Sequence, residues 1–212
     1  MSPLQKYKFN LFIVRVMTTN VVIVMVLLFY SCENTITNSS VSINYGAVIN
    51  EINYRSSSDM VNPAEDWVEL HNPTDEAIAI GLWAFKDDNN VHVFTIPEDQ
   101  ILKSGQYLIL CEDTVAFKKY SLDVGNFVAD FVGNFGFGLK SEGDQVRLFD
   151  SSGLLVDKVE YDNISPWPTE PDGTGPTLEL IHPYLDNTLG GNWATSNGNG
   201  TPGEINSVYD DK

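Results

Sequence analysis

The stretch Asp66-Trp-Val-Glu-Leu-His71 shows which class of fold to expect. If this stretch is extended, Val68 and Leu70 point to one face. Trp67, Glu69 and the final histidine then point to the opposite face. A period of two residues is that of a β-strand in a sheet. The stretch therefore predicts a strand that has one apolar face.

Similar short runs recur from Ala47 onward, and clusters of Gly, Pro, Asn and Asp separate them. They are Ala47–Tyr54, Asp66–His71, Ala77–Phe85, Val91–Ile96, Gln106–Cys111, Gln145–Asp150, Leu154–Tyr161 and Thr177–His182. The turn Asp150–Gly153 predicts a hairpin over Gln145–Tyr161. A helix of at most two turns, N-capped by Asp113, is expected over Asp113–Tyr120. Seven or eight strands at this spacing favour an all-β sandwich.

The first 31 residues have the layout of a secretory signal peptide. Three basic residues, Lys6, Lys8 and Arg15, come before the uncharged apolar run Val21–Tyr30. The run is short for a helix that crosses a bilayer. A retained membrane anchor is the alternative interpretation.

The sequence Leu28-Phe-Tyr-Ser-Cys32 resembles the signal of bacterial lipoproteins, which is cut before a cysteine that then carries lipid. This resemblance implies a signal peptide at 1–31, lipid on Cys32 and attachment to the outer membrane or cell surface of a bacterial envelope. Residues 32–45 are polar and are expected to form a flexible tether. The folded domain is expected at 46–207, followed by a disordered tail at 208–212.

The formal net charge is −17, and the 29 acidic residues all follow residue 31. Without the three basic residues of the leader, 9 basic and 29 acidic residues give −20. Such a chain lacks the Lys and Arg surplus with which proteins bind nucleic acid. Nucleic acid is therefore excluded as a partner. High acidity also favours solubility.

The order of several short segments resembles the lamin tail domain, an immunoglobulin-like sandwich that also occurs in exported bacterial proteins. The matching segments are Val48–Ile52, Asp66–Pro73, Gly81–Trp83, Phe94–Pro97, Gly105–Leu110, Phe137–Leu139 with Gly143–Asp144, Asp157–Tyr161, and Asn192–Trp193 running to Gly200–Asn206. The resemblance covers about residues 46–207. It is weakest in the insert Thr114–Asn134 and in the loop Pro166–Pro168.

The resemblance implies an interaction module that has no catalytic centre of its own. The residues that carry the motif are Glu51, Trp67, Glu69, Asn72, Gly81, Trp83, Gly143, Asp144, Asp157, Thr201, Pro202, Gly203 and Asn206. Glu51 and Glu69 lie on neighbouring strands in the family pattern. They could share a proton or bind a cation, or each could accept hydrogen bonds from loop backbone.

Catalytic motifs are absent from the sequence. The histidines His71, His92 and His182 are scattered, without the ligand spacing of a zinc site or a serine in a nucleophile turn. The thiol of Cys111, which ends an apolar run, is expected to be buried and inert. An enzyme is therefore not expected, although a calcium-dependent hydrolase stays open as an alternative.

Calcium is the one cofactor that the sequence suggests, because calcium needs six to eight oxygen ligands. The densest oxygen-bearing loop is Asp87-Asp-Asn-Asn90, that is Asp87, Asp88, Asn89 and Asn90. Glu170–Thr174 is a weaker candidate. Either loop could equally be an ordinary turn.

Trp167 and Trp193 lie in loops, where exposed aromatic rings could contact a sugar or a peptide. They could instead cover one end of the sandwich. We therefore expect a non-catalytic, membrane-anchored module that binds a protein or an envelope polymer. A carbohydrate-binding accessory protein that uses these two tryptophans is the alternative.

Overall fold

The computed structural model describes residues 10–18, 21–29, 46–124 and 129–211. The chain divides into two compact units, Met1–Ile43 and Asn44–Lys212. The first contains an antiparallel hairpin of β1 (Asn10–Thr18) and β2 (Val21–Phe29). Among the described residues, no helix is both long and apolar enough to cross a membrane. The predicted lipidation site Cys32 and the tether 32–45 lie outside the described residues.

The second unit is built mainly of short strands and has one α-helix in its described part. The strands are β3 (Val48–Asn53), β4 (Trp67–His71), β5 (Ile78–Ala79), β6 (Ala84–Lys86), β7 (Phe94–Thr95), β8 (Ile101–Leu102), β9 (Tyr107–Cys111), β10 (Phe131–Gly133), β11 (Gly143–Phe149), β12 (Leu155–Asp162), β13 (Leu178–Leu180) and β14 (Trp193–Thr195). The helices are α1 (Thr114–Val124) and the 3-10 turn η1 (Gly190–Asn192).

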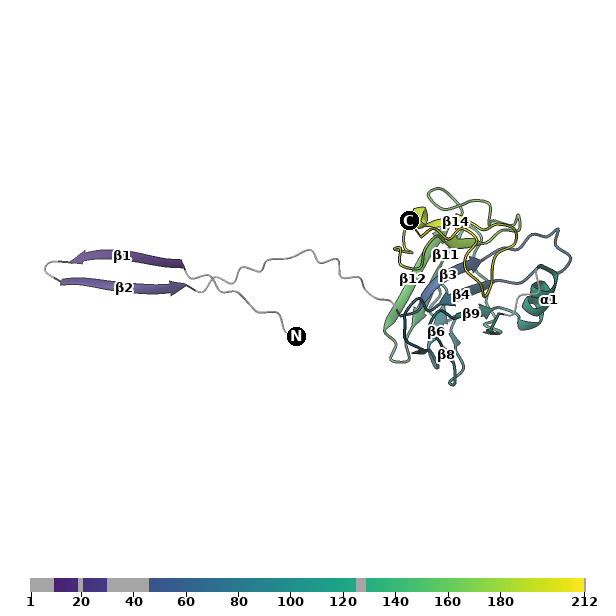
Figure 1. The fold of residues 1–212 in the computed structure, drawn as a ribbon, viewed down its shortest axis with the longest axis horizontal. Helices are drawn as coiled ribbons and strands as arrows, with labels where there is room; N and C mark the ends of the chain where they lie inside the picture. The colour runs from purple at the N-terminus through teal and green to yellow at the C-terminus, as the bar shows by residue number, and fades with distance from the viewer. Residues whose placement is uncertain (1–9, 19–20, 30–45, 125–128, 212) are drawn as a thin grey trace. The chain divides into compact units, whose positions relative to one another are not determined.

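Two sheets pack face to face (Figure 1). One has the order β10-β9-β4-β3-β13-β14, and the other has the order β12-β11-β6-β7. β5 and β8 form a small separate pair. The hairpin predicted over Gln145–Tyr161 is confirmed by β11 and β12. The architecture is that of the expected all-β, immunoglobulin-like fold.

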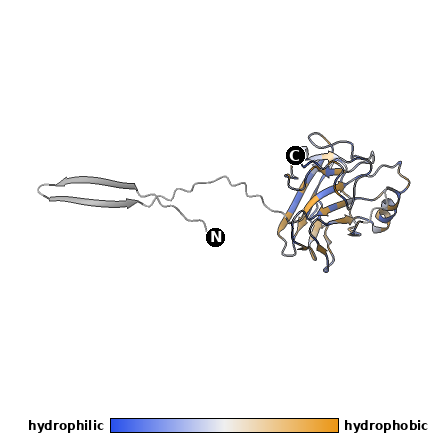
Figure 2. Cartoon of the chain, in the orientation of Figure 1, coloured by the Kyte–Doolittle hydropathy of each residue, from blue (hydrophilic) through white to orange (hydrophobic). Residues whose placement is uncertain are grey.

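Apolar and polar residues alternate along the strands, so each sheet has an apolar face. The apolar faces of the two sheets meet and form the main core. Val68 and Leu70 of β4 lie in this main core with Leu178 and Leu180 of β13, and all four side chains are at most 1% exposed. Figure 2 shows hydrophobic and hydrophilic segments side by side on the strands of the domain. Burial of this apolar surface is the main force that holds the sheets together.

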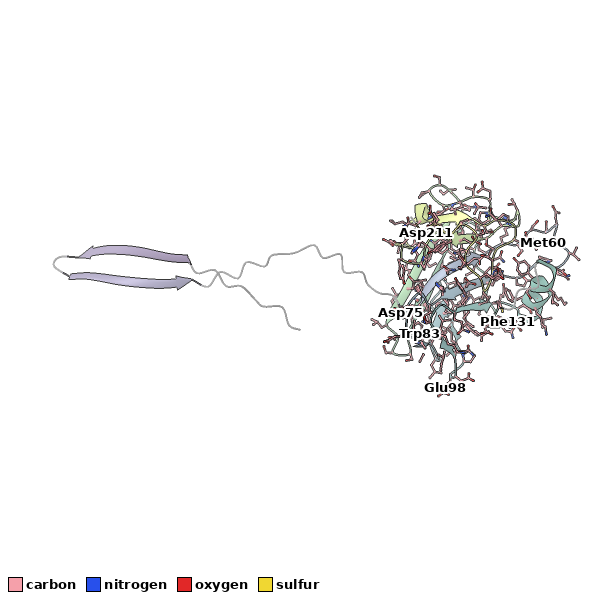
Figure 3. The ribbon with its side chains drawn as sticks, viewed as in Figure 1. Met60, Asp75, Trp83, Glu98, Phe131 and Asp211 are labelled. Atoms are coloured by element: carbon pink, nitrogen blue, oxygen red, sulfur yellow. The ribbon has the colours of Figure 1, made fainter. Side chains whose placement is uncertain are left out.

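A second, smaller core lies on the outer face of the six-stranded sheet, under α1. Trp67 of β4 contacts Phe117 and Tyr120 of the helix, with ring centroids 5.8 and 6.4 Å apart. Met60 and Phe131 pack against this cluster, and Figure 3 labels both on the side of the domain where α1 lies.

The helix confirms the expected N-cap and corrects the expected length. The Asp113 Oδ1 atom accepts hydrogen bonds from the backbone N–H groups of Val115 (2.7 Å) and Ala116 (3.0 Å). The helix runs for 11 residues to Val124, beyond the two turns that the sequence predicts. Contact with the Trp67 cluster stabilises it, and such packing extends helices beyond what local sequence favours.

Several predicted strands are shorter in the structure than in the sequence analysis. The run Ala77–Phe85 divides into β5 and β6 because the chain turns sharply at Gly81. A Cβ atom on Gly81 would lie 2.0 Å from the carbonyl oxygen of Glu98, so only glycine fits there. The run Val91–Ile96 is reduced to β7. The sequence analysis did not identify β8, β10 and β14 as separate strands.

The C-terminal end also differs from expectation. Val208 donates its backbone N–H to Glu179 Oε2 (3.1 Å), and Asp210 donates its own to the carbonyl of Ile181 (3.2 Å). These bonds tie the last residues to β13. The prediction of a disordered tail at 208–212 was therefore wrong for the described residues of that segment.

Candidate binding site

Three glutamates form a row across the outer face of the six-stranded sheet. Glu51 of β3 lies opposite Glu69 of β4 and opposite Glu179 of β13. All three side chains are 0% exposed. We call them the glutamate row. The expectation that Glu51 and Glu69 lie on neighbouring strands is confirmed, whereas the sequence analysis missed Glu179.

The C-terminal segment 199–208 covers this row and supplies most of its hydrogen-bond donors. Glu51 Oε1 accepts the N–H of Thr201 (3.1 Å), and Glu69 Oε2 accepts the N–H of Gly203 (2.6 Å). Glu179 accepts bonds from the Thr201 hydroxyl (2.8 Å) and the Ser207 hydroxyl (2.7 Å). Of the alternatives weighed for this pair, acceptance of hydrogen bonds from loop backbone is present in the structure.

The segment also needs glycine where it crosses the row. Gly200 has φ +97°, and a Cβ atom there would lie 2.4 Å from Glu51 Oε1. Neither the backbone conformation nor the available space allows a side chain. Gly200, the first residue of the sequence Gly200-Thr-Pro-Gly203, therefore allows the segment to lie close to the carboxylates.

Burial gives the row an unusual electrostatic state. Loss of water and the neighbouring carboxylates Glu69 and Glu179 raise the pKa of Glu51 well above its ordinary value. Burial raises the pKa of Glu69 to about 8, despite two hydrogen bonds that favour its ionised form. The Glu51 Oε2 atom is buried and has no hydrogen-bond partner. Glu51 is therefore the member of the row that most readily keeps a proton at neutral pH.

A second acidic group lies at the predicted calcium loop. The carboxylates of Asp87, Asp88 and Asp144 each offer an oxygen within 4.8 Å of the others. We call them the aspartate cluster. The structure thus brings two residues of the predicted loop together with Asp144, which the sequence analysis had placed only among the motif residues. Asn89 and Asn90 are not part of the cluster.

The chain supplies its own cations to the aspartate cluster. Lys140 Nζ pairs with Asp88, and His92 Nδ1 lies 2.6 Å from Asp87 Oδ2. The Arg147 side chain donates to the carbonyl oxygen of Asp87 (2.8 Å) and to the side-chain oxygen of Asn90 (3.0 Å). The asparagines mainly shape the turn. A calcium ion would have to compete with Lys140 and Arg147 for the oxygens.

The two tryptophans proposed for ligand contact are buried. Trp167 is 8% exposed and Trp193 is 3% exposed, and their ring centroids lie 6.0 Å apart. The Trp193 indole donates to the carbonyl of Asn187 (2.8 Å). Of the two alternatives for these rings, exposure for ligand contact is wrong, and both rings instead belong to the main core of the sandwich.

Two exposed tyrosines, Tyr184 and Tyr209, line a pocket of about 370 Å³ whose lining also includes Asn50 and Leu180, the chain neighbours of Glu51 and Glu179. The three tyrosines of its wall are Tyr107, Tyr184 and Tyr209. His71 stacks on Tyr107 with centroids 4.2 Å apart, and His182 lies 5.1 Å from Tyr209. We call this the tyrosine pocket. Local sequence gave no signal for it, because its residues come from five separate segments of the chain.

The tyrosine pocket and the glutamate row share a hydrogen-bonded support. The Asn50 amide donates to Glu69 Oε1 and to Asn206 Oδ1, both at 2.8 Å. Asn206 in turn donates to the carbonyls of Asn50 (3.0 Å) and Leu180 (2.8 Å). Asn50 and Asn206 also line the pocket. The C-terminal segment therefore covers the row and at the same time forms one side of the pocket.

The other motif residues fix turns or fill the core. The Asp157 carboxylate accepts the N–H of Ile49 (2.7 Å), and the Asn72 side chain bonds to the backbone of the loop that follows it. Asp144 Oδ2 accepts the N–H of Lys140 (3.0 Å). Trp67, Trp83 and Pro202 are buried. Gly143 has φ +128° where β11 begins.

The described residues show no hydrogen bond between a histidine and the side chain of a serine, threonine or cysteine. His71 Nδ1 contacts the carbonyl of Gln106 (3.3 Å), and burial lowers the pKa of this histidine. Cys111 is 1% exposed, as expected, and burial raises its pKa to about 12. Such a thiol is a poor nucleophile, because the reactive form is the thiolate.

Comparison with known proteins adds the family. A search of curated proteins found no match. The model of the family described as Lamin Tail Domain matches residues 43–163, which is more than half of the chain. The matched part contains Glu51, Glu69 and the aspartate cluster, whereas Glu179 and the C-terminal segment lie beyond it. The chain belongs to the lamin tail domain family.

Proposed function

We propose that this chain is a non-catalytic interaction module that binds a partner protein at the tyrosine pocket. The observation that carries the proposal is the pocket itself, an open site lined by tyrosines. Tyrosine is enriched where proteins contact partners, because it buries much area and also has a polar end. Lamin tail domains are immunoglobulin-like and often mediate protein interactions.

The position of the pocket supports the same conclusion. Tyr184 is 67% exposed, yet its hydroxyl donates to the carbonyl of Pro73 (2.6 Å), which fixes the ring. A ring that is held in place and exposed loses little freedom when a partner binds. The buried tryptophans offer no comparable surface for a sugar, so the tyrosine pocket favours a protein over a carbohydrate polymer.

We further propose that the module is held at a bacterial envelope by lipid on Cys32. Support for this comes from the order of basic residues, apolar run and small residue before that cysteine. A lipid anchor with more than one acyl chain would give durable attachment. The strongly acidic domain would then stay away from anionic lipid headgroups, because like charges repel.

Site-specific photo-crosslinking tests the binding role in the full chain. A photoreactive amino acid is placed at Tyr184 or, as a control, at Leu154 in the turn between β11 and β12. Both positions are 67% exposed. We expect a distinct protein adduct from position 184 and none from position 154. Equal labelling from both positions would contradict a specific site at the pocket.

Mass spectrometry of the mature N-terminus tests the anchor. We expect a diacylated or triacylated Cys32 as the first residue, and a Cys32→Ala chain that no longer takes up a labelled fatty acid. An intact leader, or a mature terminus at another residue, would show that the anchor is wrong and leave the binding role unaffected.

A further inference from the structure

The tyrosine pocket combines aromatic walls with a one-sided distribution of charge. Its lining includes three tyrosines, two histidines, two prolines and one carboxylate, Asp75, and it includes no lysine or arginine. Asp75, labelled in Figure 3, is exposed at the rim. The only formal charge that the lining fixes at neutral pH is therefore negative.

Two titratable groups of the pocket wall are uncharged at neutral pH. The phenol of Tyr107 is protonated at pH 7, because burial raises its pKa to about 12. His71 adds no opposing charge, because burial lowers its pKa from 6.5 and the ring is neutral at pH 7.

The rings themselves favour a cation. The face of a tyrosine ring is negative because of its quadrupole, and it attracts ammonium and guanidinium groups within about 6 Å. His71 stacks on Tyr107, and His182 stacks with Tyr209, so each of these two tyrosine rings is packed against a histidine. Tyr209 is 45% exposed and Tyr184 is 67% exposed, which leaves both rings accessible.

The size of the pocket limits what can enter. Its volume of about 370 Å³ is at the low end of the range for small-ligand sites, and it is open on one side. One long side chain with its flanking backbone fits such a space. Two rigid prolines, Pro73 and Pro183, also line the pocket and add to its fixed walls.

We propose that the tyrosine pocket receives a lysine or arginine side chain from an extended segment of the partner protein. This inference rests on the proposed function and names the chemistry of its ligand. Charge complementarity selects this occupant over a second copy of the chain, because the chain after its leader carries 9 basic and 29 acidic residues and repels itself. A neutral sugar would gain nothing from the charge of Asp75.

Peptide titration against the full chain in detergent, followed by NMR, tests the proposal. The probes are blocked Gly-Ser-X-Ser-Gly peptides, with lysine, arginine, norleucine, citrulline or glutamate at X. Norleucine and citrulline keep the length of lysine and arginine without the charge. We expect the lysine and arginine peptides to shift the signals of Tyr107, Tyr184 and Tyr209, with affinities at least about tenfold above those of the neutral peptides. The glutamate peptide should not bind.

Variants separate the charge from the rings. Asp75→Asn should weaken lysine-peptide binding by about threefold, as is typical of a rim charge, whereas Asp99→Asn, at an exposed site outside the pocket, should have no effect. Tyr184→Leu and Tyr209→Leu keep an apolar side chain but remove the aromatic face, and each should weaken binding by about three- to tenfold. Thermal melting shows whether each variant is folded.

The outcomes distinguish this inference from the proposed function. Equal binding of lysine and norleucine peptides at the pocket would contradict the preference for a cationic side chain, but it would still agree with a protein-binding pocket. If no peptide shifts the pocket signals while crosslinking at position 184 still yields a specific adduct, only the preference for a cationic side chain is contradicted. If maltohexaose shifts those signals and the peptides do not, both proposals fail.

Discussion

The glutamate row and the aspartate cluster are both groups of three carboxylates, yet the chain treats them in opposite ways. The aspartate cluster is surrounded by Lys140, Arg147 and His92. In the described residues, the glutamate row accepts hydrogen bonds from hydroxyl, amide and backbone N–H donors, and none of these donors is a lysine or arginine. The aspartate cluster thus has cationic side chains in contact with it, whereas the glutamate row has neutral donors.

This difference shows what burial without a counter-ion requires. Neutral donors cannot cancel the repulsion of three carboxylates that face each other across adjacent strands. Burial and this repulsion raise the pKa of Glu51 and of Glu69, so these two glutamates keep protons at pH values where exposed carboxylates have lost them. In the aspartate cluster, the hydrogen bond from Lys140 instead lowers the pKa of Asp88. Similar acidity thus predicts different responses to pH, substitution and metal ions.

The largest expected effect is a loss of stability as pH rises. A carboxyl group whose pKa is raised on folding contributes stability that is fully present below its unfolded value, near 4.5, and lost as pH rises through the folded value. For Glu69 the folded value is about 8. Between pH 5.5 and 8, unfolding releases about one proton from this carboxyl group. Over these 2.5 pH units the free energy of unfolding therefore falls by roughly 3 kcal/mol. Urea unfolding at a series of pH values measures this slope.

Two variants identify the source of the slope. Glu51→Gln removes one charge from the row and should flatten the dependence on pH. Asp66, whose pKa burial raises to about 7, acts in the same direction, so Asp66→Asn measures its share. Stability that is constant or rises from pH 5.5 to 8 in the parent would contradict the proposed protonation of the row.

A smaller effect is expected from replacing individual glutamates by glutamine. Both oxygens of Glu69 accept bonds, one from the Asn50 amide and one from the Gly203 N–H. In Glu69→Gln, the NH2 group of the glutamine would face either the Asn50 amide or the Gly203 N–H, and two donors cannot form a hydrogen bond. The variant should therefore lower the free energy of unfolding by about 2 kcal/mol at pH 8.

Glu51→Gln is the matched control, because Glu51 Oε2 has no donor to lose. It should be neutral or stabilising at the same pH. Equal destabilisation by the two variants would contradict the idea that the hydrogen-bond donors of each carboxylate determine the cost of its replacement.

The smallest effect is expected from divalent cations at the aspartate cluster. Protein cations already contact it, so millimolar calcium should raise the melting temperature by less than about 1 °C, and magnesium should do the same. The variant that combines Asp87→Ala with Asp88→Ala is the control. A larger rise with calcium alone, absent from the double variant, would establish a calcium site.

Local periodicity predicted the strands well where one residue in two is apolar. Residues 66–71 were predicted as a strand, and 67–71 form β4 with Val68 and Leu70 in the main core. The predicted turn at Asp150–Gly153 joins the hairpin of β11 and β12. The short strands were missed because long-range pairing creates them. β10, for example, exists because residues 131–133 pair in parallel with β9.

The candidate site was less visible in the sequence. The alternation Leu178-Glu179-Leu180 was a signal that Glu179 leaves the core, but only the strand order shows that it meets Glu51. The tyrosine pocket gave no local signal, since Tyr107 begins a strand and Tyr184 and Tyr209 lie in separate loops. Conversely, the sequence left open whether Trp167 and Trp193 are exposed, and tertiary packing buries both.

The C-terminal segment has a consequence for the order of folding. Its bonds from Thr201 to Glu51 and from Gly203 to Glu69 join residues 150 and 134 positions apart. Contacts so distant in sequence form slowly, because a large loop must close before they give any stability. Until residues 199–208 dock, Glu51 and Glu69 lack this cover and ionise as exposed carboxylates do. Docking buries them and raises the pKa of both, so it drives the uptake of protons, and acidic conditions should accelerate the last step of folding.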